Sequence, residues 1–226
     1  MTPAEYTRTK RDEYNALVST PAWGTALLKE AEEAGTWRTG IESDRKQRGT
    51  AINTALYGYD QAQGLAVVQV REAAFHPTKW TRVRKDYYLI GHNENGQVFA
   101  HPVGTPSRSK LALASPEATV AYILAKIWDC RPEDLKDIVR QGDCAFIPIL
   151  RIPFYAEEVA GPVTLRNTHI LTGDIWQHDG VYYTRRGAKL THTKGQHATI
   201  KAKGGYYRVQ EGIRATHWGF TAPHGD

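Results

Sequence analysis

The sequence predicts an α+β protein with N-terminal helices, a central β-hairpin region, a helical pair, and a C-terminal antiparallel β-barrel or strongly bent sheet. Three observations predict this class. Apolar residues recur at helical spacing near the N-terminus, the period changes to two from Leu65, and short apolar segments separated by glycine turns follow Gly142. The expected regions cover residues 1–64, 65–114, 115–141 and 142–226.

The first region is expected to be helical. Leu17, Leu27 and Ala31 fall at helical spacing on either side of Pro21, which should separate two helices. The charged run over residues 42–48 is typical of a solvated helix face or a loop.

The second region is expected to be a small sheet. A strand is predicted over residues 65–70, and a hairpin over residues 87–101, because Asn95-Gly96 is a strong signal for a tight turn. In the third region, Ser115 precedes Pro116 and Glu117, a pattern that predicts a helix start. A second short helix should begin near Pro132.

The last region is expected to be nearly all strand. A Gly-Asp pair precedes an apolar segment at Gly142 and again at Gly173, a pattern common where the strands of small barrels bend. Asp179-Gly180 predicts a tight hairpin turn. Many short strands at even spacing predict a closed or nearly closed antiparallel sheet.

The composition limits the class of protein. The 226 residues carry a net charge of +5, which favours a polyanionic partner such as nucleic acid or a nucleotide. Cys130 and Cys144 form no CxxC pair, so neither a disulfide framework nor a cysteine zinc site is expected. The sequence shows no signal peptide and no long apolar run, so we expect a cytoplasmic protein without a membrane partner. Phosphate-binding glycine loops, GxSxG elbows and HExxH motifs are also absent from it.

The stretch THTKGQH, residues 191–197, suggests a site. If residues 193–196 form a hairpin loop, His192 and His197 lie directly opposite each other, with Cβ atoms about 5 Å apart. Two imidazoles in that position can bind one divalent metal ion, which needs three or four ligands. The further ligands are expected from His169 and His217, with Asp174 as a carboxylate alternative.

The same residues permit a reaction without metal. One of His192 and His197 would act as general base and the other as general acid on a phosphodiester, because imidazole titrates near neutral pH. A cation would stabilise the transition state. The cations available are Lys194, Lys201, Arg185, Arg186 and Arg208.

A second cluster is basic and aromatic. Cations that neutralise phosphates alternate with an aromatic ring that can stack on a base, as in proteins that bind nucleic acid. Its residues are Lys79, Trp80, Arg82, Arg84 and Lys85, and the mixture recurs around Arg185, Arg186 and Arg208. Core packing of the aromatic rings is the alternative interpretation.

These patterns support three hypotheses. The first is a phosphodiester hydrolase acting on nucleic acid or a nucleotide, with His192, His197 and Lys194 as catalytic residues and Zn, Mn or Fe as the divalent metal. In that hypothesis the metal ligands are His169, His192, His197 and His217. The second is a nucleic-acid-binding module without catalysis, and the third is a structural or protein-interaction domain.

Overall fold

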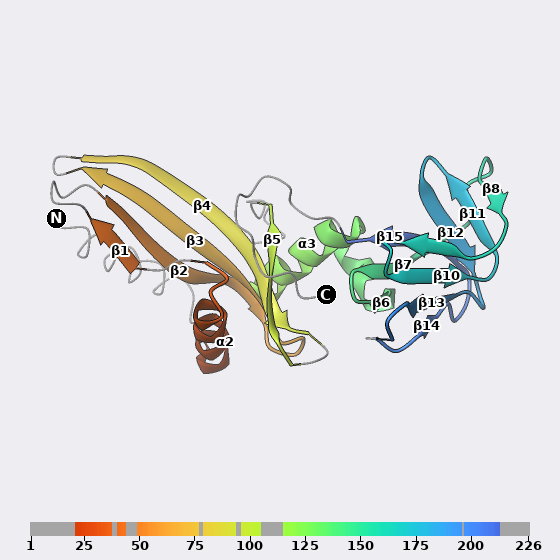
Figure 1. Ribbon diagram of the computed structural model, residues 1–226, viewed down its shortest axis with the longest axis horizontal. Coiled ribbons are helices and arrows are strands. Elements are labelled where there is room, and N and C mark those ends of the chain that lie inside the picture. Colours follow the sequence, from red (N-terminus) through yellow and green to blue (C-terminus); the bar gives the residue numbers. More distant parts are fainter. Residues whose placement is uncertain are drawn as a thin grey trace. The chain divides into compact units, whose positions relative to one another are not determined.

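A computed structural model describes residues 21–37, 40–43, 49–76, 79–93, 96–104, 115–195 and 197–212. Within these ranges, only the backbone is described for residues 40–43, 49–51, 75–76 and 79–83. The described chain forms three antiparallel sheets and few helices (Figure 1). It divides into two compact units. The described part of unit 1 ends at Ile123, and unit 2 begins at Leu124.

Unit 1 is built on one five-stranded sheet in which strands pair in the order of the chain. Along its third strand, Ala66, Val68 and Val70 point to one face, where they pack against Leu27 and Ala31 of the helix α2. The elements are α2 (Ala22–Glu33), β1 (Gly40–Ser43), β2 (Gly49–Asp60), β3 (Leu65–His76), β4 (Lys79–His92) and β5 (Val98–Val103).

Two expectations for this part need correction. Within the region predicted to be helical, the described helix covers only α2, and residues 40–60 contribute β1 and β2. Strand β2 pairs with β3 along its length, so tertiary pairing decides a segment whose own periodicity is weak. The hairpin between β4 and β5 is confirmed, and in it His92 pairs with Val98. The helix predicted before Pro21 lies outside the described residues.

The predicted helical pair is confirmed. The helix α3 (Pro116–Trp128) begins at Ser115, whose Oγ accepts a hydrogen bond from the backbone N–H of Ala118 at 3.1 Å, as expected of an N-cap. The second member, η1 (Pro132–Asp137), is a 3₁₀ helix. No helix in the described ranges is long and apolar enough to cross a membrane.

Unit 2 contains two open sheets that share a core. The six-stranded sheet has the order β6 (Val139–Gln141), β7 (Cys144–Ile149), β15 (Tyr206–Glu211), β12 (Val181–Arg185), β11 (Ile175–His178) and β8 (Glu157–Val159). The four-stranded sheet has the order β14 (Ile200–Lys201), β13 (Lys189–His192), β10 (His169–Thr172) and β9 (Val163–Leu165). Phe146 and Ile175 from the first sheet pack with Leu171 and Leu190 from the second.

The predicted C-terminal barrel is wrong. In the described residues, β14 and β9 are the edges of one sheet, β6 and β8 are the edges of the other, and neither sheet closes on itself. Two packed open sheets and a closed barrel share the same alternation of inward apolar and outward polar residues along short strands. The sequence pattern therefore could not separate them.

Candidate functional site

Two of the predicted histidines face each other across neighbouring strands. His169 at the start of β10 is the direct register partner of His192 at the end of β13. Both point into unit 2, with only 2% and 4% of their surfaces exposed. Their ring centroids are 5.0 Å apart and the ring planes are nearly perpendicular, at 89°.

The third histidine of this site, His197, comes from the segment between β13 and β14. Its ring centroid is 5.1 Å from that of His192 and 6.4 Å from that of His169, and its plane is nearly parallel to the His169 ring. The structure thus brings together three of the four histidines predicted as ligands. His217 lies outside the described residues.

The predicted hairpin over residues 193–196 is wrong. Leu190 pairs with Ile200, so the connection between the strands is longer and His197 is not opposite His192. The chain turns directly after β13, where the N–H of Gly195, in a left-handed conformation at φ +65°, donates to the His192 carbonyl. His197 therefore reaches the site from the connection, and His169 takes the position opposite His192.

Gly142, in the turn between β6 and β7, leaves room for the imidazoles. A Cβ at this position would lie 3.1 Å from Nε2 of His197 and 3.7 Å from Nε2 of His169. The residue also has φ +55°, a conformation that glycine adopts without cost. Two Nε2 atoms thus lie beside one glycine, where a larger residue would crowd the rings.

The neighbouring residue, Gln141, holds the segment that carries His197. Its buried side-chain amide donates to the Ala198 carbonyl at 2.6 Å. Its Oε1 is buried and makes no hydrogen bond with any described residue. This oxygen is an unsatisfied acceptor of the kind that a bound water or ion can satisfy.

The two nitrogens of His169 have different surroundings. Nδ1 lies 3.0 Å from the Thr168 hydroxyl and 3.7 Å from a carboxylate oxygen of Asp143. Nε2 is buried and has no hydrogen-bond partner among the described residues. Burial lowers the pKa of the His169 imidazole, although the Asp143 carboxylate opposes the shift. The ring is therefore neutral at pH 7, and a proton on Nδ1 beside the carboxylate leaves the Nε2 lone pair available.

An arginine fixes the carboxylate beside His169. Arg166 donates through Nη1 to Asp143 at 2.8 Å, through Nε to Glu211 at 2.7 Å, and through Nη2 to the Gly212 carbonyl at 2.8 Å. Asp143 thus lies between a guanidinium and an imidazole. Outer carboxylates often orient histidine ligands, but at 3.7 Å from Nδ1 this one makes no direct hydrogen bond to the ring.

Asp143, Cys144 and His169 also bring potential ligand atoms within 4.8 Å of one another. The Cys144 thiol is unsuited to bind a metal here. It is fully buried, burial raises its pKa, and it donates to Asp143 at 3.7 Å. A thiol must lose its proton to act as a ligand. The trio therefore offers a carboxylate and an imidazole, but no thiolate, to a metal ion.

A hydrogen bond to Nδ1 determines which tautomer the neutral His192 ring adopts. Its Nδ1 accepts from the backbone N–H of Lys194 at 3.2 Å. A neutral ring that accepts at Nδ1 carries its proton on Nε2. Metal binding through Nε2 moves that proton to Nδ1, which breaks this hydrogen bond.

The sequence interpretation missed the residues that support the histidines. Asp143 follows Gly142 in the Gly-Asp pattern, which predicts a turn. The pattern does not indicate that the Asp143 carboxylate lies 3.7 Å from His169. Gln141 and Arg166 gave no signal, because their partners lie 57 and 45 residues away in the chain.

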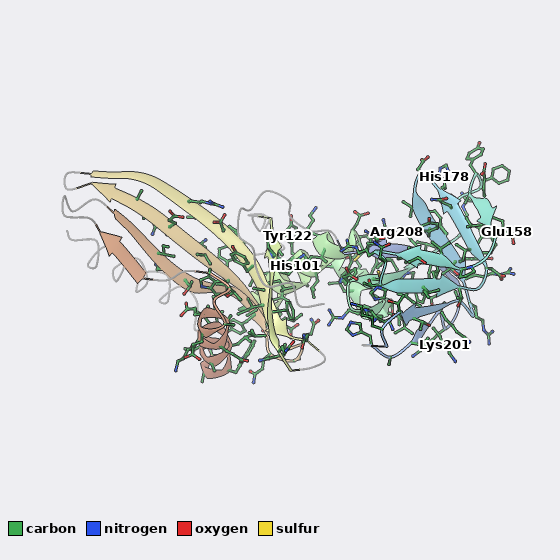
Figure 2. The ribbon with its side chains drawn as sticks, viewed as in Figure 1. His101, Tyr122, Glu158, His178, Lys201 and Arg208 are labelled. Carbon is green, nitrogen blue, oxygen red and sulfur yellow. The ribbon has the colours of Figure 1, made fainter. Side chains whose placement is uncertain are left out.

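Several residues predicted for other roles direct their side chains to other partners or to solvent. Asp174, the carboxylate alternative, pairs with Arg185 at 2.6 Å. Arg208, labelled in Figure 2, pairs with Asp129 at 2.5 Å. The side chains of Lys194 and Arg186 are exposed.

The basic and aromatic cluster on β4 is described only in part. The side chains of Lys79, Trp80 and Arg82 lie outside the described residues. Arg84 pairs with the buried Asp86 at 2.9 Å, and Lys85 is exposed. The nucleic-acid role of this strand stays a prediction.

The fold and the site define a two-unit, mainly β protein with a cluster of three imidazoles at the end of a strand pair in unit 2. Comparisons with protein-family models, with curated proteins and with solved structures found no match to this chain.

Proposed function

We propose that this chain is a metal-dependent phosphodiester hydrolase whose metal is held by His169, His192 and His197. The observation that supports the proposal best is the convergence of His169 and His197 on His192, together with the buried Nε2 of His169, which has no hydrogen-bond partner among the described residues. A buried polar atom without a partner costs about 1–3 kcal/mol, so its retention needs an explanation.

The ring spacing comes close to that needed for one shared ion. Three imidazoles that bound one zinc ion would have ring centroids about 5 Å apart. Two of the observed separations are 5.0 and 5.1 Å, but the third is 6.4 Å. Among the described residues, the three potential ligand atoms that lie within 4.8 Å of one another belong to Asp143, Cys144 and His169, so the imidazoles would have to move to share an ion. Neutral imidazole ligands favour Zn or Fe over Mg or Ca.

The metal-free reaction is supported less well. General acid and base groups must contact the phosphodiester, yet His192, one of the two residues expected in these roles, is only 4% exposed. Burial and a neutral ring are both compatible with metal binding.

A divalent metal held by these three histidines would supply a water with a lowered pKa as the nucleophile near neutral pH. The chain itself would orient His169 through Asp143 and Arg166, and would hold His197 through Gln141. The net charge of +5 supports a phosphodiester substrate.

The test is hydrolysis of bis(p-nitrophenyl) phosphate by the full chain after zinc, manganese or iron is added. We expect activity that a chelator removes and that falls at least about 100-fold in His169→Gln and in His197→Gln. His178→Gln is the matched control, because this partly exposed histidine of β11 (Figure 2) lies outside the cluster and should keep full activity. Activity that survives the chelator or both cluster variants would contradict the proposal.

A further inference from the structure

The four-stranded sheet of unit 2 has an outward face made of threonines and lysines. Residues alternate along its strands, so Leu171, Leu190 and His192 point inward. The alternate residues on the outward face are Thr164, Ile170, Thr172, Lys189, Thr191, Thr199 and Lys201, the lysine–threonine face. It contains no carboxylate and no aromatic ring.

Two lysines lie directly opposite each other on this face. Lys189 of β13 is the register partner of Lys201 of β14, and both are exposed. Figure 2 labels Lys201 on this sheet. Like charges in directly opposed positions destabilise a strand pair, so an anion that binds both would relieve a cost present in the free protein. Two residues further along the same face, the hydroxyls of Thr191 and Thr199 are 3.2 Å apart.

The surrounding segment is strongly basic. From Gly180 to Gln210 the sequence contains no Asp or Glu. Its cations are Arg185, Arg186, Lys189, Lys194, Lys201, Lys203 and Arg208. Arg185 and Arg208 pair with acids from outside the segment. The side chains of the other five are exposed and make no ion pair with a described residue.

We infer that the lysine–threonine face binds the phosphodiester backbone of a nucleic acid. The inference rests on the proposed function and deepens it, because it identifies the substrate class. Lysines neutralise phosphates and threonine hydroxyls donate to phosphate oxygens, whereas the absence of aromatic rings on this face leaves nothing to stack on bases. Binding is therefore independent of sequence.

The face and the histidines lie on opposite sides of the same strand. Lys189 and His192 are three residues apart on β13, about 10 Å along the strand, with Lys189 outward and His192 inward. Lys194 follows in the turn after β13 and is exposed. A backbone bound along β13 would extend toward the turn that carries the imidazole cluster.

The test is binding of labelled oligonucleotides to the full chain, measured by fluorescence anisotropy between about 0.05 and 0.3 M salt with a chelator present to prevent hydrolysis. We compare single-stranded DNA, single-stranded RNA and duplex DNA of one sequence to find which kind of nucleic acid binds. The test variant is Lys189→Gln with Lys201→Gln. The control is Lys136→Gln with Arg140→Gln, which removes two exposed charges from η1 and β6 of the same unit.

We expect the test variant to bind about ten-fold or more weakly near 0.1 M salt, and its plot of log K against log salt to lose a slope of about 2. The control should bind like the wild type. Absence of wild-type binding, equal loss in both variants, or tighter binding to anionic lipid vesicles than to every oligonucleotide would overturn the inference. The chelator separates binding from hydrolysis. Oligonucleotides that bind in its presence, but stay intact when zinc, manganese or iron replaces it, would overturn the catalytic proposal and leave this surface intact.

Discussion

His169 and His192 occupy directly opposed positions on β10 and β13, with ring centroids 5.0 Å apart and planes at 89°. The antiparallel register, rather than a hairpin, brings these rings together. Both face the interior of unit 2, and the edge of one ring points at the face of the other. Any role for the cluster depends on this pair.

The stability of the metal-free protein should fall as the pH falls below neutral. An unfolded histidine has a pKa of about 6.5, whereas burial lowers the pKa of His169 in the folded state. Below about pH 6.5 the unfolded chain therefore binds a proton that folded His169 does not, which favours unfolding. The loss should continue until the folded pKa is reached, with a slope of at most about 1.4 kcal/mol per pH unit.

Urea unfolding between pH 5 and pH 8 in the presence of a chelator measures this effect. His169→Gln should show a smaller slope than the wild type, and His178→Gln should match the wild type. Identical slopes in the wild type and in His169→Gln would show that His169 does not titrate differently in the two states.

Arg166 should affect both stability and metal binding. Arg166→Ala removes three hydrogen bonds and leaves Asp143 and Glu211 without their cation, so we expect a loss of about 2–3 kcal/mol in the free energy of unfolding. Zinc affinity should fall about 10- to 100-fold, because Asp143 would no longer be fixed beside His169.

Arg166→Lys separates charge from geometry. A lysine cannot make the forked contacts of the guanidinium, so this variant should resemble Arg166→Ala in zinc affinity more than the wild type. Zinc affinity equal to the wild type in both variants would contradict an orienting role for Asp143.

Gly142→Ala should weaken metal binding beyond its effect on the backbone. The left-handed conformation alone costs about 1–2 kcal/mol for a residue with a Cβ. Gly161→Ala is the control, because Gly161 has φ +77° and its added Cβ would meet nothing within 4 Å. Both variants should be less stable in thermal unfolding, but only Gly142→Ala should lose zinc affinity in a competition titration. Equal zinc affinities of Gly142→Ala and Gly161→Ala would show that a Cβ at position 142 does not crowd the rings of His197 and His169.

Metal binding should release the backbone N–H of Lys194. In the free protein this group donates to Nδ1 of His192 at 3.2 Å, and a metal at Nε2 places a proton on that nitrogen. NMR should therefore show a large shift of the Lys194 amide and faster hydrogen exchange on zinc addition. An unchanged Lys194 amide in a zinc-bound protein would show that His192 does not bind through Nε2.

Short-range patterns predicted local structure well in this chain. Asp179 and Gly180 adopt φ +49° and +76°, as a tight hairpin turn requires, and set His178 opposite Val181. Ser115 caps α3 as expected. In each case the partners are a few residues apart, so the chemistry that fixes the structure is visible in one short stretch.

Long-range pairing decided the features that were predicted wrongly. The sequence suggested His192 and His197 as a hairpin pair, but strand register placed His169 opposite His192. Closure of the sheet depends on which edges meet, and the alternation of residues does not encode that. Asp143 and Arg166 belong to the site because the fold places the turn at Gly142 next to the turn before β10, a long-range contact that the local sequence does not encode.

The metal content of the purified protein shows most directly whether the three histidines bind a metal ion. The full chain, purified without a histidine tag, is to be analysed by elemental mass spectrometry as isolated and after dialysis against zinc. We predict about one Zn, Mn or Fe ion per chain in the wild type and in His178→Gln, and less than about one tenth of that in His169→Gln and in His197→Gln. A wild type that retains no metal after dialysis, or cluster variants that retain as much as the wild type, would contradict the account.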